Sequence, residues 1–322
     1  NRIIDLFSGM GGFRYAFEKN GFQCVYSADY DKYACDTYEA NFKEHPYQDI
    51  TQLDASDIPD HDILCAGFPC QPFSIGGYRK GFDDTRGTLF FDILRILTEK
   101  KPNFFVLENV AGLLNHDKGK TFSTILNALA SEINNIPNPD ASNDCLKYKV
   151  YWTTFNSSDF GLPQNRKRVF IVGVKNNNNF VFTKPNIKQL KLTDILDKDP
   201  EIKDISKMSY EYIMQYLKMH KNYDTIKSLD CLVAYEIRKS RVSFRFDNLS
   251  PCLTTKMGTG GNNVPYFVNQ KRFFTIKEML AIQGYPKSYG ITLNYTQALR
   301  QLGNTVSINV INQIAKDILK VI

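Results

Sequence analysis

A short apolar run that stops at a proline and a cysteine constrains the fold of this chain more than any other feature. The run Ile63-Leu64-Cys65-Ala66 predicts a buried strand, and Gly67-Phe68-Pro69-Cys70-Gln71 follows it directly. Pro69 fixes its own backbone angle and biases Phe68 away from helix, so we expect the Cys70 thiol on a stiff turn at a strand end. In open parallel sheets, ligands bind at the carboxyl ends of the strands. We interpret Cys70 as a nucleophile, and the alternative is a buried structural cysteine.

The N-terminus repeats this pattern of a strand followed by a special turn. Residues 2–7 predict a strand, Ser8-Gly9-Met10-Gly11-Gly12 predicts a turn, and a helical run follows. Glycines let a backbone approach a ligand closely, and a helix start offers unpaired N–H groups. The spacing is not G-x-G-x-x-G, which argues against a nicotinamide or flavin site and leaves open a turn without a ligand.

Acidic residues follow the next predicted strands. Residues 24–28 end at Asp29-Tyr30, where a carboxylate could accept hydrogen bonds from ribose hydroxyls and the Tyr30 ring could stack beside adenine. The alternative for Asp29, or for Asp31, is a helix N-cap. Further on, Asp49 could accept a hydrogen bond from the adenine amino group while Ile50 packs on the ring.

Two more polar groups stand at strand ends. The apolar run 104–107 leads into Glu108, and burial there would raise the pKa of the carboxyl group so that it holds a proton near neutrality. The alternative is a surface or helix-capping acid. In Gln164-Asn165-Arg166-Lys167-Arg168, two arginines two residues apart would share one side of a strand start and grip an anion or a carbonyl; the alternative is a solvated basic turn.

Charge and composition divide the chain. Residues 176–275 hold 16 Lys and Arg against 10 Asp and Glu, which accounts for the net charge of +6. A basic, glycine-punctuated segment suits a nucleic-acid groove, notably at 238–245 and 256–263, although ordinary β-hairpin surface explains it as well. We expect a catalytic and cofactor domain at 1–176, a recognition domain at 177–270, and a return to the catalytic domain at 271–322, including the C-terminal helix.

The composition also bounds the environment. The chain has no run of 18 apolar residues for a membrane span and no room before its first strand for an export signal. Its seven cysteines form no C-x-x-C pair, so the sequence indicates neither a zinc cluster nor a disulfide framework. We therefore expect a cytoplasmic protein, without a metal ion.

Taken together, the motifs strongly resemble the DNA cytosine-5 methyltransferases, in particular the small bacterial enzymes of restriction-modification systems. The resemblance spans essentially the whole chain. Its motifs, in order, are Asp5 to Gly12, Gly67 to Ser74, Glu108-Asn109-Val110, Gln164 to Arg168, Arg272 through Pro286, and Gly303-Asn304-Thr305-Val306.

The resemblance implies a fold, a reaction and a partner. The fold would be a doubly wound α/β domain with a mostly parallel sheet, the S-adenosylmethionine-dependent methyltransferase fold, with a second, smaller target-recognition domain. The reaction would be methylation of C5 of a cytosine flipped out of duplex DNA, with S-adenosylhomocysteine as product. A monomer is expected, and a cognate restriction endonuclease would act on the same sequence.

It also implies residue roles. Cys70 would add to C6, Glu108 would protonate or hydrogen-bond N3, Arg168 would hold O2, and Arg166 and Gln164 would support the loop. The residues that would hold S-adenosylmethionine are Phe7, Gly9, Met10, Gly11, Gly12, Asp29, Tyr30, Asp49, Ile50, Pro69, Leu89, Asn304 and Thr305. The residues that we expect to contact DNA are Ser74, Arg79, Arg238, Arg241 and Lys256.

Two alternatives remain open at this point. One is an RNA methyltransferase of the same fold, although that branch has a Pro-Pro-Cys turn where this chain has Phe68-Pro69-Cys70. The other is a DNA-binding protein without activity, which the presence of Cys70, Glu108 and Arg168 argues against.

Overall fold

The computed structural model describes residues 1–69, 89–176, 178–203, 205–259 and 263–322, so Cys70, Ser74 and Arg79 lie outside the described residues. The chain forms two compact units. Unit 1 comprises Asn1–Phe155, Lys167–Lys184 and Val310–Ile322, and unit 2 comprises Asn156–Arg166 and Pro185–Asn309. Residues 271–309 thus group with unit 2, whereas the last helix belongs to unit 1. The recognition role of 177–270 stays a prediction.

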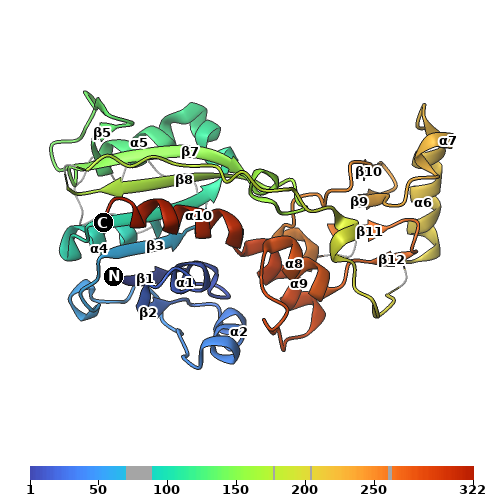
Figure 1. Cartoon of the computed structure of the whole chain (residues 1–322), viewed down its shortest axis with the longest axis horizontal. Helices are drawn as coiled ribbons and strands as arrows, with labels where there is room; N and C mark the ends of the chain where they lie inside the picture. The colour runs from blue at the N-terminus through green and yellow to red at the C-terminus, as the bar shows by residue number, and fades with distance from the viewer. Residues whose placement is uncertain (70–88, 177, 204, 260–262) are drawn as a thin grey trace. The chain divides into compact units, whose positions relative to one another are not determined.

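Unit 1 is built on an eight-stranded sheet in the order β2-β1-β3-β4-β8-β7-β5-β6 (Figure 1). The pairs β1/β2, β1/β3, β3/β4 and β5/β7 are parallel, and β4/β8 and β5/β6 are antiparallel. The strands are β1 (Arg2–Leu6), β2 (Gln23–Ala28), β3 (Ile63–Gly67), β4 (Phe104–Val110), β5 (Ala130–Ile133), β6 (Ile136–Pro137), β7 (Tyr148–Asn156) and β8 (Lys167–Val174). This mostly parallel sheet confirms the predicted fold class.

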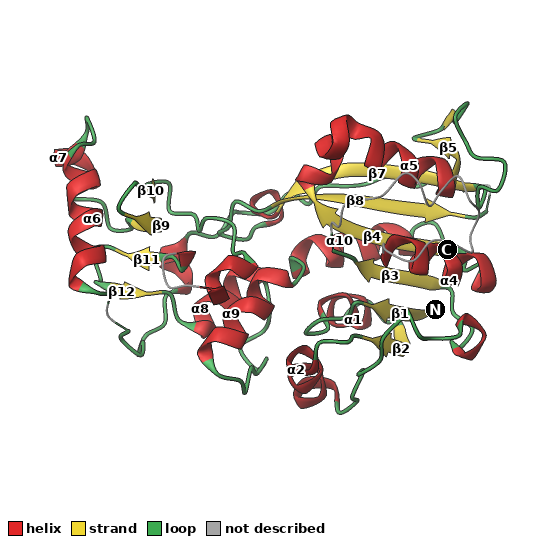
Figure 2. Cartoon of the chain, turned by 180° about the vertical axis from the view of Figure 1, so that it is seen from behind, coloured by secondary structure: helices red, strands yellow, loops and turns green. Residues whose placement is uncertain are grey.

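Helices cover both faces of this sheet, as Figure 2 shows. The helices of unit 1 are α1 (Gly12–Glu18), α2 (Lys32–Phe42), α4 (Leu89–Lys100), α5 (Lys120–Leu129) and α10 (Ile308–Leu319), which begins at the end of unit 2. Alternate residues of the central strands, such as Leu6, Ala66 and Leu107, pack with the apolar sides of α4 and α5. On the other face, the side chain of Asn20, just after α1, donates to Asn312 of α10 at 2.8 Å. Burial on both faces explains why these strands read as unbroken apolar runs.

The strand order predicts where a ligand would bind. From β1 the chain first adds β2 on one side and then β3 on the other, so the direction of winding reverses between β1 and β3. In open α/β sheets, ligands bind outside the carboxyl ends of the strands at such a switch point. The glycine turn follows β1, and the turn that leads to Cys70 follows β3.

Unit 2 contains a four-stranded sheet in the order β10-β9-β11-β12. Its strands are β9 (Val233–Arg238), β10 (Arg241–Arg245), β11 (Tyr266–Phe267) and β12 (Arg272–Phe273), and its helices are α6 (Lys207–Lys218), α7 (Tyr223–Ile226), α8 (Ile276–Gln283) and α9 (Tyr295–Asn304). Ile213 and Leu217, one helical turn apart on α6, pack on Ala234 and Tyr266 of the sheet.

A buried ion pair fixes the start of α8 in unit 2. The Arg272 guanidinium donates two hydrogen bonds to the Glu278 carboxylate, at 2.7 and 2.9 Å, and both side chains are at most 2% exposed. Glu278 also accepts from the backbone N–H of Thr275, whose hydroxyl caps the helix in return. The buried charge is therefore paired and fully hydrogen-bonded.

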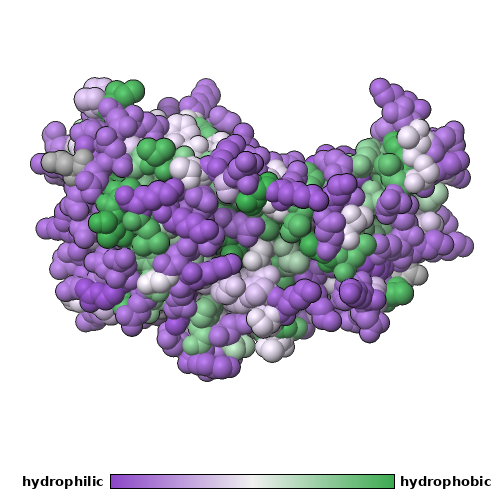
Figure 3. Space-filling model, in the orientation of Figure 1, coloured by the Kyte–Doolittle hydropathy of each residue, from purple (hydrophilic) through white to green (hydrophobic). Residues whose placement is uncertain are grey.

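Polar side chains dominate the surface of both units on the face that Figure 3 shows. None of the helices in the described residues is long and apolar enough to cross a membrane. The six cysteines in the described part of the chain are all free thiols.

Candidate active site

The glycine turn after β1 has a backbone that few sequences tolerate. Phe7, Gly9 and Gly11 have φ angles of 53°, 54° and 77°, in the left-handed region. A Cβ atom added to Gly11 would lie 2.2 Å from the Phe42 ring, so this position requires glycine. A strained non-glycine residue such as Phe7 is typical of ligand-binding segments. Met10 and Gly12 are buried beneath the turn.

Asp29 ties this turn to the end of β2. One of its carboxylate oxygens accepts from the backbone N–H of Gly9 at 2.7 Å, and the other accepts from the N–H of Asp31 at 2.8 Å. Burial raises the pKa of Asp29, and these backbone bonds oppose the shift. A backbone hydrogen bond from Tyr30 also reaches this carboxylate, but its two oxygens together offer about four lone-pair sites, so it can still accept from a ribose hydroxyl. The N-cap of α2 is Asp31, which is one of the two alternatives that the sequence left open.

Three further predicted cofactor residues differ in exposure. The Tyr30 ring is 64% exposed, which leaves its face available for stacking on a base. Ile50 is only 2% exposed, whereas the neighbouring Asp49 is exposed and accepts from both the N–H and the hydroxyl of Thr51.

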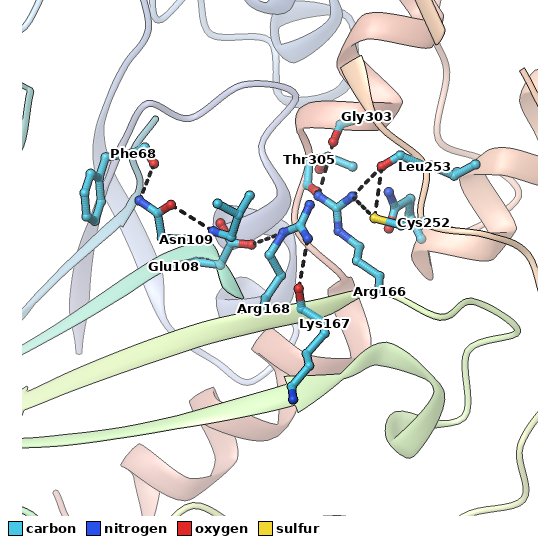
Figure 4. A network of polar contacts seen from close by, with 12 residues as sticks. Phe68, Glu108, Asn109, Arg166, Lys167, Arg168, Cys252, Leu253, Gly303 and Thr305 are labelled. Carbon is cyan, nitrogen blue, oxygen red and sulfur yellow. Dashed lines mark hydrogen bonds and ion pairs between the residues drawn. The ribbon is translucent and has the colours of Figure 1, made fainter. Parts of the chain in front are cut away.

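The ends of β3 and β4 are locked together by an amide (Figure 4). The Asn109 side chain donates to the backbone carbonyl of Phe68 at 2.9 Å, and its oxygen accepts from the N–H of Val110 at 2.8 Å. Asn109 is 3% exposed, so neither bond competes with bulk water. Phe68 is followed by Pro69, the last described residue before Cys70. Asn109 therefore fixes the backbone from which the candidate nucleophile extends.

Glu108 lies beside this turn and is paired with an arginine. In the parallel ladder of β3 and β4, Glu108 is opposite Gly67, three residues before Cys70. The Nε atom of Arg168, on β8, lies 3.0 Å from Oε1 of Glu108, and the carboxylate is 7% exposed. An exposed acid, the alternative from the sequence, does not describe this residue.

Arg166 and Gln164 hold both backbone polar groups of one residue of unit 2, Leu253. The Gln164 side chain accepts from the N–H of Leu253 at 3.0 Å, and Arg166 donates to the Leu253 carbonyl at 2.7 Å. Arg166 also donates to the carbonyls of Gly303 and Thr305, at 3.2 and 2.7 Å. Both side chains are at most 2% exposed. We call this arrangement the Leu253 clamp.

The clamp changes the interpretation of the two arginines. Arg166 grips carbonyls of its own chain, whereas Arg168 pairs with Glu108, so the two guanidinium groups have separate partners (Figure 4). A solvated basic turn is excluded for Arg166 because it is 2% exposed.

The predicted cofactor residues at the end of α9 belong to unit 2. Asn304 is exposed, and the Thr305 hydroxyl lies 2.5 Å from that of Tyr285. A Cβ atom on Gly303 would lie 2.2 Å from the backbone of Thr254, so the helix end and the segment of Leu253 pack backbone to backbone. Leu89, the remaining predicted cofactor residue, is the first residue of α4 in unit 1 and is half-buried.

The candidate DNA-contacting residues in the described chain lie in unit 2. Arg241, on β10, forms an ion pair with Glu236 at 2.6 Å and is 60% exposed. Arg238 contacts the Asn263 side chain at 3.5 Å, and Lys256 is exposed in the short helix Thr255–Thr259. Their recognition roles stay predictions.

Sequence reasoning missed three supporting residues. Asn109, Arg95 and Gln283 each bind a backbone carbonyl of a segment that carries a candidate site residue, namely those of Phe68, Ile50 and Leu302. The sequence does contain an indication of the role of Asn109, because this amide directly follows the acid Glu108 at the end of a predicted strand. Arg95 and Gln283 lie within helices and had none.

The fold and these strand ends define a class. The doubly wound sheet has a constrained glycine turn after β1, an acid after β2 and a paired carboxylate at the end of β4, which agrees with the α/β methyltransferase fold that the sequence predicts. The chain belongs to the C-5 cytosine-specific DNA methylases, since the model of that family matches residues 1–320.

Individual relatives agree with this assignment. The chain is 41% identical over 320 residues to the Type II methyltransferase M.NgoBI of Neisseria gonorrhoeae, covering 98% of this chain and 92% of that one. It is 42% identical to M.HaeII of Haemophilus aegyptius and 38% identical to M.HhaI of Haemophilus parahaemolyticus, covering 91% and 94% of those proteins and 98% of this chain.

Solved structures show the same fold at lower identity. The Dnmt2 methyltransferase of S. pombe superposes with a TM-score of 0.70 at 18% identity, over 99% of this chain and 98% of that one. The Entamoeba histolytica methyltransferase EhMeth gives a TM-score of 0.68 at 18% identity, over the same shares.

Proposed function

We propose that this DNA cytosine-5 methyltransferase transfers a methyl group from S-adenosylmethionine to C5 of a cytosine flipped out of a short specific duplex sequence, as the modification half of a restriction-modification system. The observation that carries the proposal is the buried Glu108–Arg168 pair beside the strand end that leads to Cys70. A carboxyl group and a thiol are the two groups that C5 chemistry needs, because that carbon must be activated by addition at C6.

The donor fits the residues at the carboxyl ends of the strands in unit 1. Asp29 would bind the ribose, Tyr30 would stack on adenine, Asp49 would accept from its amino group, and the turn from Phe7 would lie against the methionine part. S-adenosylmethionine would supply the methyl group. The fit rests on the lone pairs left on Asp29, the exposed face of Tyr30 and the strained turn at Phe7. Asn304 and Thr305 remain predicted cofactor residues.

The chain's own residues would perform the remaining steps. The Cys70 thiolate adds to C6, and the electron pair of the C5–C6 bond moves toward N3, where Glu108 donates a proton or a hydrogen bond. Arg168 orients the Glu108 carboxyl through its 3.0 Å contact, and its other donors would hold O2 of the base. After C5 is methylated, loss of the C5 proton and departure of the thiolate restore the aromatic ring.

Covalent trapping tests the proposal. Duplex DNA with 5-fluorocytosine at the target cannot lose a proton from C5, so the wild-type chain should remain attached through Cys70. The adduct should survive denaturing electrophoresis and be absent with Cys70→Ala, which should still bind DNA because phosphate contacts dominate affinity. Transfer RNA serves as the competing substrate. Methylation of transfer RNA in place of duplex DNA, or an adduct that persists in Cys70→Ala, would refute the proposal.

A further inference from the structure

The loop after the predicted adenine-binding residues is held by a helix. Arg95 of α4 donates to two backbone carbonyls of this loop, Nη2 to Ile50 and Nη1 to Leu53, each at 2.8 Å. Lys100, also on α4, donates to the Ser56 carbonyl at 3.0 Å. The loop is therefore attached to α4 at its start by a two-pronged contact and at its far end by a single one.

The attachment at Arg95 controls where Asp49 points. The carbonyl of Ile50 and the N–H of Thr51 belong to one peptide group, and that N–H donates to Oδ1 of Asp49, so Arg95 fixes the group that holds the carboxylate. Oδ1 of Asp49 accepts from the N–H and the hydroxyl of Thr51, and no donor in the described residues reaches Oδ2. The planar guanidinium presents its donors in a rigid fork that suits two separate carbonyls, whereas an ammonium offers its three donors from one point on a flexible stem.

Charge gives a second reason for an arginine at this position. Asp92, one turn before Arg95, lies 3.5 Å from its guanidinium. Burial raises the pKa of Asp92, the positive charge of Arg95 opposes this, and the negative charge of Asp49 adds to it. The two carboxylates are thus within electrostatic reach of each other, and Arg95 offsets their repulsion.

We propose that Arg95 is a positioning residue that sets the selectivity of the cofactor site for adenine, by aiming the Asp49 carboxylate at the adenine amino group. This inference rests on the proposed function, because it takes Asp49 as an adenine contact. Arg95 itself need not touch the cofactor. Its effect reaches the ligand through the loop backbone.

Binding of two nucleosides by the full chain tests the inference. S-adenosylhomocysteine offers an amino group to Asp49, whereas S-inosylhomocysteine offers a carbonyl oxygen, which a carboxylate repels. Calorimetry should show that the wild type prefers the adenine compound by about tenfold or more, the value of one charge-assisted hydrogen bond. Arg95→Met should lose most of this preference, mainly by weaker binding of the adenine compound, and Arg95→Lys should recover only part of it.

Lys100→Met is the matched control, because it releases the same loop at the Ser56 end. It should keep the adenine preference of the wild type. An unchanged preference in Arg95→Met, or an equal loss of affinity for both compounds, would overturn the inference, since the role would then be absent or merely structural.

Asp49→Asn separates failure of the inference from failure of the proposed function. If Asp49→Asn loses the adenine preference and Arg95→Met keeps it, Arg95 is not the positioning residue and the cofactor site stands. If the wild type binds neither compound, the proposed function itself fails, and the inference fails with it.

Discussion

Replacing Arg166 by methionine should loosen one defined part of unit 2. The substitution keeps an unbranched apolar stem but removes donors from the carbonyls of Leu253, Gly303 and Thr305, which lie 2.7, 3.2 and 2.7 Å from the guanidinium. A hydrogen bond to a charged group contributes about 1.5–3 kcal/mol. Because the contacts share one side chain their losses are not independent, and we expect a local loss of about 3–5 kcal/mol.

Hydrogen exchange is the suitable measurement because the effect is local. A loss of 3–5 kcal/mol corresponds to amide exchange about a hundredfold to several thousandfold faster, provided that exchange proceeds through local opening. The amide of Leu253, which donates to Gln164, and that of Thr305, which donates to the Gln301 carbonyl, are the reporters. Amides of β1 and β3 in unit 1 serve as the internal reference.

Arg168→Met is the control, since it removes a guanidinium two residues away that pairs with Glu108. It should leave exchange at Leu253 and Thr305 unchanged while methyl transfer falls. If Arg166→Met left protection at these amides within a few-fold of wild type, the clamp would carry little of the stability assigned to it. If Arg168→Met accelerated them equally, the effect would not be specific to the clamp.

Three other predictions follow from the site and its surroundings. Glu108→Gln should slow single-turnover methyl transfer strongly while cofactor affinity changes little, because an amide can donate to N3 but cannot deliver a proton; a rate within a few-fold of wild type would remove Glu108 from the mechanism. Burial raises the pKa of Asp5, so the folded state holds a proton that the unfolded state releases above about pH 4. The free energy of unfolding should therefore fall as the pH rises toward the folded pKa. The urea midpoint of Asp5→Asn should depend less on pH than that of the wild type, and equal slopes of midpoint against pH would contradict this. Arg241→Ala should relax the choice of DNA sequence, measured by bisulfite sequencing, because a base contact contributes about 1–3 kcal/mol of discrimination. Lys188→Ala should instead weaken binding to all DNA sequences and reduce the salt dependence of binding. The reverse pattern would exclude Arg241 as a residue that reads bases.

The strand ends were predictable because their signals are local. An apolar run followed by a polar residue gives both the burial and the position of Asp29 and Glu108, and the proline before Cys70 marks a turn within the same few residues. The parallel sheet then brings these ends together without further information. The compact units were less predictable, because residues 271–309 carry ordinary helical periodicity and only their contacts assign them to unit 2.

The supporting contacts were not predictable because they join residues far apart in the chain. Arg166 reaches the Leu253 carbonyl across 87 positions and that of Thr305 across 139. Arg95 reaches Ile50 across 45 positions from the middle of an amphipathic helix, where an arginine ordinarily marks a solvated face. Their acceptors are backbone carbonyls, which every residue possesses, so no residue type in the sequence reveals the partner.

Because these supporting side chains bond to backbone atoms, neighbouring side chains can be substituted without breaking the bonds. The Leu253 clamp binds the N–H and the carbonyl of one residue, and Gly303 allows its helix to meet the backbone of Thr254, so what is held fixed is the path of the chain. Side chains that project from this path, such as Lys256, can change without loss of any bond in the clamp. If this segment contacts DNA as predicted, its DNA-contacting groups can be exchanged while its position is kept by Gln164 and Arg166. Under the proposed role of Asp49 the same logic applies there, because the carboxylate would choose the ligand while Arg95 holds only the neighbouring Ile50–Thr51 peptide group.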